Sequence, residues 1–246
     1  MQHVFETMGT VVSVAIPLDA RPGGAQPSAA LAAVERVFAA YDAEYSRYRP
    51  ESPAAQIADG RLALTRASEA HRDMYAQAVA WRNRTGGAFD PHRADGTVDL
   101  AGIVKAAAIE RAGDALDEAG VASWCVNAGG DVLVRGVVDD APWGVGIAHP
   151  DDRRVLLTSI ALDGAWRAIA TSGTGERGEH IWRSDPAAEL RQATVVAEDI
   201  VTADVLSTAI IAGGTATLYE AVHTWRVRVV AVTRTGDLIE AEPTTP

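Results

Sequence analysis

Residues 124–134 read Trp-Cys-Val-Asn-Ala-Gly-Gly-Asp-Val-Leu-Val, two β-rich runs on either side of adjacent glycines. Two further runs of this kind, 143–147 and 156–160, follow at short intervals and are separated by Gly, Asp and Pro. Short apolar runs with such boundaries are typical of an antiparallel sheet. The glycine pair fits a plain hairpin turn, and it equally fits a backbone N–H cradle for a phosphate or a ring edge.

Helical patterns precede and follow these predicted strands in the sequence. Apolar residues at helical spacing, with glycines at the ends, predict helices over 28–41, 67–84, 103–119 and 202–212, the last stopping at Gly213-Gly214. A first strand over 11–16 and a last pair over 225–232 and 238–241, joined by a Thr-Gly-Asp turn signal, complete the pattern. Because helices and strands mix without strict β-α-β alternation, the predicted class is α+β with mixed, mainly antiparallel sheets.

Composition and charge exclude several classes of protein. With 246 residues, 48% of them apolar, the chain can bury a core as one large domain or two small lobes. A formal net charge of −11 argues against general binding to nucleic acid or to an anionic membrane, since both need a basic face. No run approaches the roughly 18 apolar residues of a membrane span, and the N-terminus lacks a basic segment followed by an apolar one. We therefore expect a cytoplasmic protein.

The single cysteine, Cys125, excludes an internal disulfide framework. It lies in a predicted strand, whereas a reactive thiolate needs an electropositive and partly exposed setting. A buried, inert thiol is therefore favoured over a nucleophile.

The segment Asp99-Leu100-Ala101-Gly102-Ile103-Val104-Lys105 leads into a predicted helix. Gly102 lets a ligand approach the backbone, and the free N–H groups at a helix start favour an anion. Lys105 falls in the first turn, where the helix dipole gives a cation no benefit, so a negative group nearby would explain it. The plainer interpretation is an Asp99 N-cap and a solvated lysine, and both interpretations stay open.

Two later segments combine hydroxyls with ionisable groups. In residues 170–175, Ala-Thr-Ser-Gly-Thr-Gly, hydroxyls and glycines suit contact with phosphate or ribose, and His180 close behind is a candidate general base. A loop with a surface histidine explains these residues equally well. Further on, Asp204 and Thr208 share one helix face and offer a carboxylate and a hydroxyl, ligands that suit Mg²⁺. The alternative is a capping Asp204 and a Thr208 bonded back to its own helix.

Seven segments, taken together and in this order, resemble the FAD:protein FMN transferase (ApbE) family. They are Met8-Gly9-Thr10, Tyr45-Ser46-Arg47-Tyr48-Arg49-Pro50, Thr85-Gly86-Gly87-Ala88-Phe89-Asp90-Pro91, residues 99–105, residues 127–131, Thr171-Ser172-Gly173 with His180-Ile181, and residues 203–208. Each is unspecific alone, but seven in the family's order are hard to obtain by chance. The resemblance implies a single ApbE-like (T-fold-like) domain over residues 1–246, with a ligand cleft between two lobes.

The resemblance also implies binding sites for FAD and a metal ion. FAD would lie near a set of residues from four of these segments: Met8, Asp99, Asn127, Gly129, Thr171, Ser172 and Gly173. Mg²⁺, or Mn²⁺ in the same oxygen-rich site, would be held by the Gly102 carbonyl, the Asp204 carboxylate and the Thr208 hydroxyl. Phosphate oxygens of FAD would complete the shell.

The implied reaction is Mg²⁺-dependent transfer of FMN from FAD to a Thr or Ser hydroxyl of an acceptor flavoprotein, with release of AMP. The hydroxyl would attack the FMN-side phosphorus, His180 would be its base, and Lys105 would help to neutralise charge. One alternative is an FAD pyrophosphatase that gives FMN and AMP, with water as the attacking group. Another is a non-catalytic FAD-binding protein, because residues 182–188 after His180 do not carry the family's Asp-Pro-Arg-Thr-Gly tract.

Overall fold

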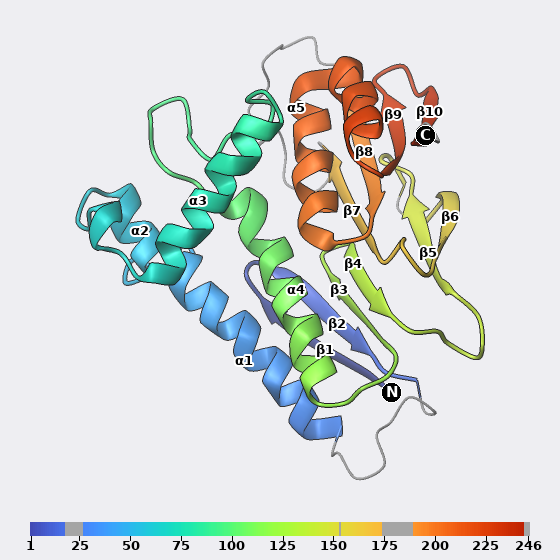
Figure 1. Cartoon of the computed structure of the whole chain (residues 1–246), viewed down its shortest axis with the longest axis horizontal. Coiled ribbons are helices and arrows are strands. Elements are labelled where there is room, and N and C mark those ends of the chain that lie inside the picture. The colour runs from blue at the N-terminus through green and yellow to red at the C-terminus, as the bar shows by residue number, and fades with distance from the viewer. Residues whose placement is uncertain (18–26, 153, 174–188, 244–246) are drawn as a thin grey trace.

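The computed structural model describes residues 1–17, 27–152, 154–173 and 189–243. Within these ranges the main sheet has eight strands in the order β1-β2-β3-β4-β7-β8-β9-β10, all paired antiparallel (Figure 1). The strands are β1 Gln2–Thr7, β2 Thr10–Ala15, β3 Trp124–Ala128, β4 Asp131–Arg135, β7 Ala168–Gly173, β8 Leu190–Ala197, β9 Arg228–Thr233 and β10 Leu238–Ala241. A separate antiparallel pair consists of β5 Trp143–Ala148 and β6 Leu156–Leu162.

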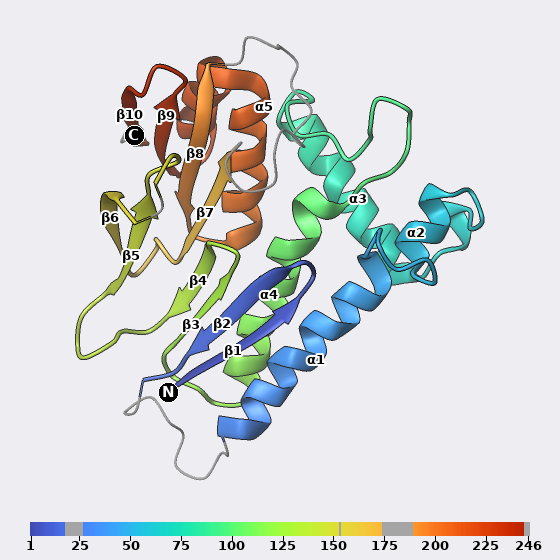
Figure 2. The ribbon, with the colours of Figure 1, turned by 180° about the vertical axis from the view of Figure 1, so that it is seen from behind.

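Helices cover one side of the main sheet, as Figures 1 and 2 show from opposite directions. The helical elements are α1 Pro27–Tyr45, α2 Pro53–Ala58, a 3₁₀ turn at Leu64–Arg66, α3 Glu69–Arg84, α4 Ala101–Glu118 and α5 Ile200–Thr224, and of these α2 and α3 lie beside the sheet rather than on it. Helix α4 packs on β3 and β4, α5 packs on β7 and β8, and α1 packs on the outside of α4. This arrangement brings the start of α4 and the first turns of α5 to the same region of the molecule.

The core has two parts, one on each side of the sheet. The larger cluster fills the space between the helices and the sheet, and its fully buried members include Phe38, Ile103, Trp124 and Leu206. The smaller cluster lies on the opposite side, where β5 and β6 pack over β4, β7, β8 and β9. The two-stranded sheet is therefore a cover for half of the sheet's second face.

Helix α5 is the central helix of the larger core. By length and composition alone it could span a membrane, but it packs against β7, β8 and α4, and 56% of its most apolar window is buried inside the protein. Asp199 caps its start by accepting a hydrogen bond from the Thr202 N–H. Gly214 has φ of 73°, so the helix bends there and resumes to Thr224.

Two hairpins end in two-residue turns whose central residues all have positive φ. In the β1–β2 hairpin these are Met8 (49°) and Gly9 (67°), and in the β3–β4 hairpin they are Gly129 (62°) and Gly130 (97°). Such turns match the twist of the flanking strands. The two turns lie side by side, because the Gly129 N–H donates to the Val11 carbonyl.

The predicted α+β class is confirmed, together with the strands of residues 124–134 and the final hairpin. The predicted ranges did not include β1, α2, the 3₁₀ turn, β7 or β8. The prediction that the last helix ends at Gly213-Gly214 was wrong. The helix bends at these glycines and continues, because Leu218 and Ala221 in its second part are buried in the core. Helix α4, predicted to begin at residue 103, begins at Ala101.

Candidate functional site

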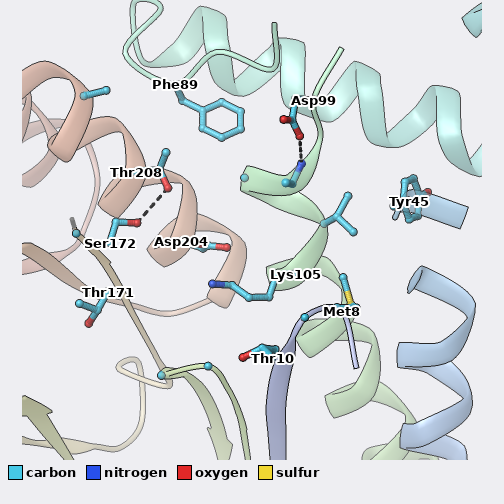
Figure 3. Close-up of a pocket in the computed structure, with 18 of the residues that line it drawn as sticks. Met8, Thr10, Tyr45, Phe89, Asp99, Lys105, Thr171, Ser172, Asp204 and Thr208 are labelled. Carbon is cyan, nitrogen blue, oxygen red and sulfur yellow. Dashed lines mark hydrogen bonds between the residues drawn. The ribbon is translucent and has the colours of Figure 1, made fainter. Parts of the chain in front are cut away.

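A large open pocket of about 1740 Å³ lies where α4, α5, the two hairpin turns and β7 meet. This volume exceeds the roughly 300–1,000 Å³ of most small-molecule sites. Its wall contains ten of the residues that the sequence predicted: Met8, Asp99, Gly102, Lys105, Gly129, Thr171, Ser172, Gly173, Asp204 and Thr208. Figure 3 shows Lys105 from α4, Asp204 from α5 and Thr171 from β7 around one space. Segments far apart in the sequence therefore converge on one site.

Asp99 organises the start of α4. Its Oδ1 accepts a hydrogen bond from the Ala101 N–H at 3.1 Å, and its Oδ2 accepts from Arg47 at 3.0 Å and from Arg93 at 2.9 Å. Burial raises the pKa of Asp99, but the Ala101 N–H and the two guanidinium groups outweigh it and lower this pKa below its ordinary value. Asp99 is therefore a carboxylate at neutral pH, and it fixes two arginines that line the pocket.

Lys105 is paired with a buried carboxylate. Its Nζ forms an ion pair with Oδ2 of Asp131, whose side chain is only 1% exposed. The Oδ1 of Asp131 accepts a hydrogen bond from the Thr171 N–H at 3.1 Å. The interpretation of Lys105 as a solvated surface lysine was therefore wrong, and the negative group expected near it is Asp131, although Lys105 lies just past the first turn because the helix begins at Ala101.

Hydroxyl groups connect β7 with α5. The Ser172 hydroxyl lies 2.8 Å from that of Ser207 and 3.2 Å from that of Thr208, and Ser207 donates to the Asp204 carbonyl (Figure 3). Ser207 is fully buried, whereas the Thr208 hydroxyl faces the pocket. These contacts fix the rotamer of Thr208 next to the first turns of α5, so this hydroxyl is bound to β7 rather than simply turned back onto its own helix.

The described part of the pocket offers oxygen donors that fit a hard cation. Asp204, 4% exposed, contributes a carboxylate, Thr208 a hydroxyl and Gly102 a backbone carbonyl, and all three residues line the pocket. No cluster of three His, Cys, Asp or Glu side chains occurs among the residues that the structure describes. A site with one carboxylate suits Mg²⁺, which usually keeps several waters and takes further oxygens from substrate phosphates.

Glycines open the pocket where the backbone comes close to other groups. A Cβ on Gly102 would lie 3.0 Å from the ring of Phe89, and one on Gly173 would lie 2.7 Å from the Arg191 carbonyl. Gly102 therefore lines the pocket at the start of α4, where the Phe89 ring leaves little room for a side chain.

Two predicted residues differ from the other ten. Asn127 does not line the pocket; its Oδ1 accepts a hydrogen bond from the Gly130 N–H at 3.0 Å and so holds the hairpin turn whose glycines do line it. The glycine pair thus forms a hairpin turn and a part of the pocket wall at once. His180 lies outside the described residues, so its role as a base stays a prediction.

Sequence reasoning missed the partners of the predicted residues. Arg47 and Arg93 bind Asp99, Asp131 binds Lys105, and Ser207 contacts Ser172. Arg47 and Asp131 stand inside the family segments quoted above, so a search for opposite charges within those segments would have found them. Ser207 also lies inside a quoted segment, but it carries no charge that such a search would detect, and Arg93 lies outside all seven segments.

The fold and the pocket define an antiparallel α+β protein with a large pocket lined by cationic and oxygen-donor side chains. The chain belongs to the ApbE family, whose model matches residues 8–95 and 92–231. The resemblance carried by the seven segments is thereby confirmed.

Solved structures show the same fold. The ApbE protein of Thermotoga maritima matches with a TM-score of 0.82 and 21% identity over 98% of this chain and 97% of that one. The flavinyl transferase ApbE of Pseudomonas stutzeri gives 0.81 and 22% over 99% and 94%, and the flavin transferase ApbE of Vibrio cholerae gives 0.80 and 21% over 99% and 97%. A search of curated proteins finds no match.

Proposed function

We propose that this protein is a Mg²⁺-dependent flavin transferase that moves FMN from FAD to a Thr or Ser hydroxyl of an acceptor protein and releases AMP. The observation that carries the proposal is the convergence of Lys105, Asp204 and Thr208 on one pocket in a chain of the ApbE family. Two solved structures with the same fold are of flavin transferases. The proposed unit is the whole chain, residues 1–246, with FAD between two lobes.

The size and polarity of the pocket support FAD as the substrate. An elongated dinucleotide needs more room than most ligands, and the pocket has it. The chain is acidic overall, yet Lys105 and four arginines (Arg47, Arg49, Arg93 and Arg191) line this wall. Five carboxylates among the described residues line the same pocket, so these cations balance its charge, and the proposed Mg²⁺ would supply the additional positive charge that a diphosphate requires.

The proposed metal ligands are the Asp204 carboxylate, the Thr208 hydroxyl and the Gly102 carbonyl. Mg²⁺ bound there would neutralise charge on the FAD diphosphate and orient it for displacement. Mn²⁺ fits the same oxygen donors. The chain's own contribution is to hold Asp204 in a buried position and to fix Thr208 through the Ser172 hydroxyl.

The proposed reaction is a displacement at the FMN-side phosphorus. The oxygen of the acceptor hydroxyl forms a bond to this phosphorus, the bond to the bridging diphosphate oxygen breaks, and AMP leaves with that oxygen and its electron pair. The hydroxyl proton passes to a base, for which His180 remains the candidate. Lys105 would contact the diphosphate and balance charge that develops on the leaving AMP.

The test is an incubation of the purified protein with FAD, MgCl₂ and candidate acceptor proteins. Intact-protein mass spectrometry detects an FMN-sized gain on an acceptor, and chromatography detects AMP. We expect both signals together, and we expect EDTA to remove both. An acceptor in which the modified Thr or Ser is replaced by Ala is the matched control. Cell fractionation tests the cytoplasmic location that we propose for this activity.

Two other outcomes would contradict the transferase proposal. Release of AMP and free FMN at the same rate with and without every acceptor would identify an FAD pyrophosphatase. FAD that co-elutes unchanged with the protein in the presence of Mg²⁺ would identify an FAD-binding protein without turnover.

A further inference from the structure

Asp131 stands behind the pocket wall and touches two residues that form it. It is the first residue of β4, directly after the Gly129-Gly130 turn, and its side chain is 1% exposed. Its Oδ2 forms the ion pair with Lys105 of α4, and its Oδ1 accepts the Thr171 N–H of β7. One carboxylate therefore binds the helix and the strand that face each other across this end of the pocket.

The contacts of Asp131 continue to the proposed metal ligand. Thr171 is followed in β7 by Ser172, whose hydroxyl lies 3.2 Å from that of Thr208. A connected path thus runs from Lys105 through Asp131 and β7 to Thr208 of α5. The positions of the proposed diphosphate-binding cation and of the proposed metal ligand are set by one network.

Burial makes this pairing costly to disturb. A buried carboxylate needs a counter-charge and hydrogen bonds, because its desolvation costs several kcal/mol. Lys105 and the Thr171 N–H supply these compensations, so the ammonium is held against the pocket wall before any ligand arrives. Charge stabilisation by a group already in position needs no reorganisation during the reaction.

We propose that Asp131 is a positioning residue: it holds the Lys105 ammonium and the Thr171 strand in the geometry that displacement of AMP from the FAD diphosphate requires. The proposal rests on the proposed contact between Lys105 and the diphosphate of FAD. Asp131 acts through Lys105 and Thr171 and does not touch the substrate. Its negative charge also offsets part of the attraction between Lys105 and FAD in the ground state.

The test is a double-mutant cycle on the full chain with Asp131→Asn and Lys105→Met. An asparagine whose oxygen still accepts the Thr171 N–H turns its NH₂ group toward the Lys105 ammonium, so the substitution removes both the charge and the acceptor that Lys105 uses. We expect Asp131→Asn to leave FAD bound as tightly as in the wild type or more tightly, while kcat falls on the order of 100-fold, as misplacement of a reacting group does. Lys105→Met should weaken FAD binding roughly ten- to hundredfold, because it removes a hydrogen bond between charged groups and this is the size of the effect that such a loss usually has.

The cycle separates positioning from a purely structural role. The proposal requires the two substitutions to be non-additive: the effect of Lys105→Met on FAD affinity should be at least several-fold different in the Asp131→Asn background. Additive effects, or a loss of kcat that matches the loss of folded protein in a thermal unfolding assay, would overturn it. Asp131→Glu keeps the charge and displaces it by one methylene, so it should recover FAD turnover only in part. Full recovery would also contradict the proposal.

The binding measurements keep this inference distinct from the proposed function. If the wild type binds FAD but never releases AMP, the transferase proposal fails while coupling between residues 131 and 105 in FAD affinity is still measured. If the wild type turns over FAD and Asp131→Asn does so equally fast, only the positioning role fails. Asp59→Asn, which alters an exposed ion pair with Arg61, is the control for nonspecific charge effects.

Discussion

Gly129 touches Thr10 so closely that no side chain fits between them: a Cβ on Gly129 would lie 2.5 Å from the Thr10 Oγ1. Because Gly129 also has a positive φ, Gly129→Ala should combine two penalties. The left-handed backbone costs about 1–2 kcal/mol for a residue with a side chain, and the clash adds about 1–3 kcal/mol. Urea unfolding measures the sum.

Gly130→Ala is the matched control for this prediction, because Gly130 has positive φ but nothing within 4 Å of its missing Cβ. It should show the backbone penalty alone. Thr10→Ala should relieve part of the cost in the double variant with Gly129→Ala. Equal destabilisation by the two glycine substitutions would mean that the two hairpin turns do not meet as described.

Asp204→Asn should remove metal-dependent activity, because it takes away the buried carboxylate that we propose as a Mg²⁺ ligand. We expect AMP release from FAD to fall by more than about 100-fold, beyond the loss usual for outer-shell partners of a metal. Stabilisation by MgCl₂ in a thermal unfolding assay with FAD should disappear as well. Activity retained at the level of the Asp59→Asn control would exclude Asp204 from the metal site.

The depressed pKa of Asp99 predicts a pH dependence of stability. The folded protein holds this carboxylate ionised to a lower pH than the unfolded chain does, for which the pKa is about 3.9. The stabilisation by Asp99 is therefore fully present above that value and is lost as the pH falls through the lower pKa of the folded state. The measurement is the free energy of unfolding in urea, from pH 7 to pH 3, for the wild type and for Asp99→Asn. At neutral pH the wild type should have the higher value, and the difference between the two proteins should shrink below about pH 4. A constant difference would contradict the pairing with Arg47 and Arg93.

Cys125 should resist alkylation in the folded protein. Burial raises the pKa of its thiol to about 12, so almost no thiolate exists at pH 8. Iodoacetamide should modify Cys125 slowly under native conditions and rapidly in urea, as mass spectrometry would record. Fast native labelling would indicate that β3 is less protected than its place inside the sheet implies.

The parts of the site that sequence could predict are those with local signals. Asp204 and Thr208 are four residues apart, so a helical pattern alone places both on one face. The Gly129-Gly130 turn follows from two glycines between β-rich runs. The pocket itself was expected only through the family resemblance, since no local pattern shows that α4 and α5 meet.

Long-range partners had no such signal. Arg47 and Asp99 are 52 positions apart, and their ion pair depends on how the end of α1 lies over the start of α4. Strand β8 was missed although it is almost wholly buried, because its sequence Leu-Arg-Gln-Ala-Thr-Val-Val-Ala shows neither an apolar–polar alternation nor a continuous apolar run. The bend in α5 was misjudged because packing of Leu218 and Ala221 extends the helix past glycines that would stop an isolated one.

The neighbours β2 and β3 lie side by side in the sheet, with Val12 opposite Ala128. Residues 16–123, which are 108 residues and include α1 to α4, are made between these two strands. At the usual rates of protein synthesis this interval is on the order of ten seconds. During that time the backbone N–H and C=O groups of β2 that pair with β3 in the folded protein have no partner strand. Chaperones that shield nascent strands should therefore raise the yield of folded protein. A circular permutant in which the β1–β2 hairpin is moved to the C-terminus should depend on these chaperones less.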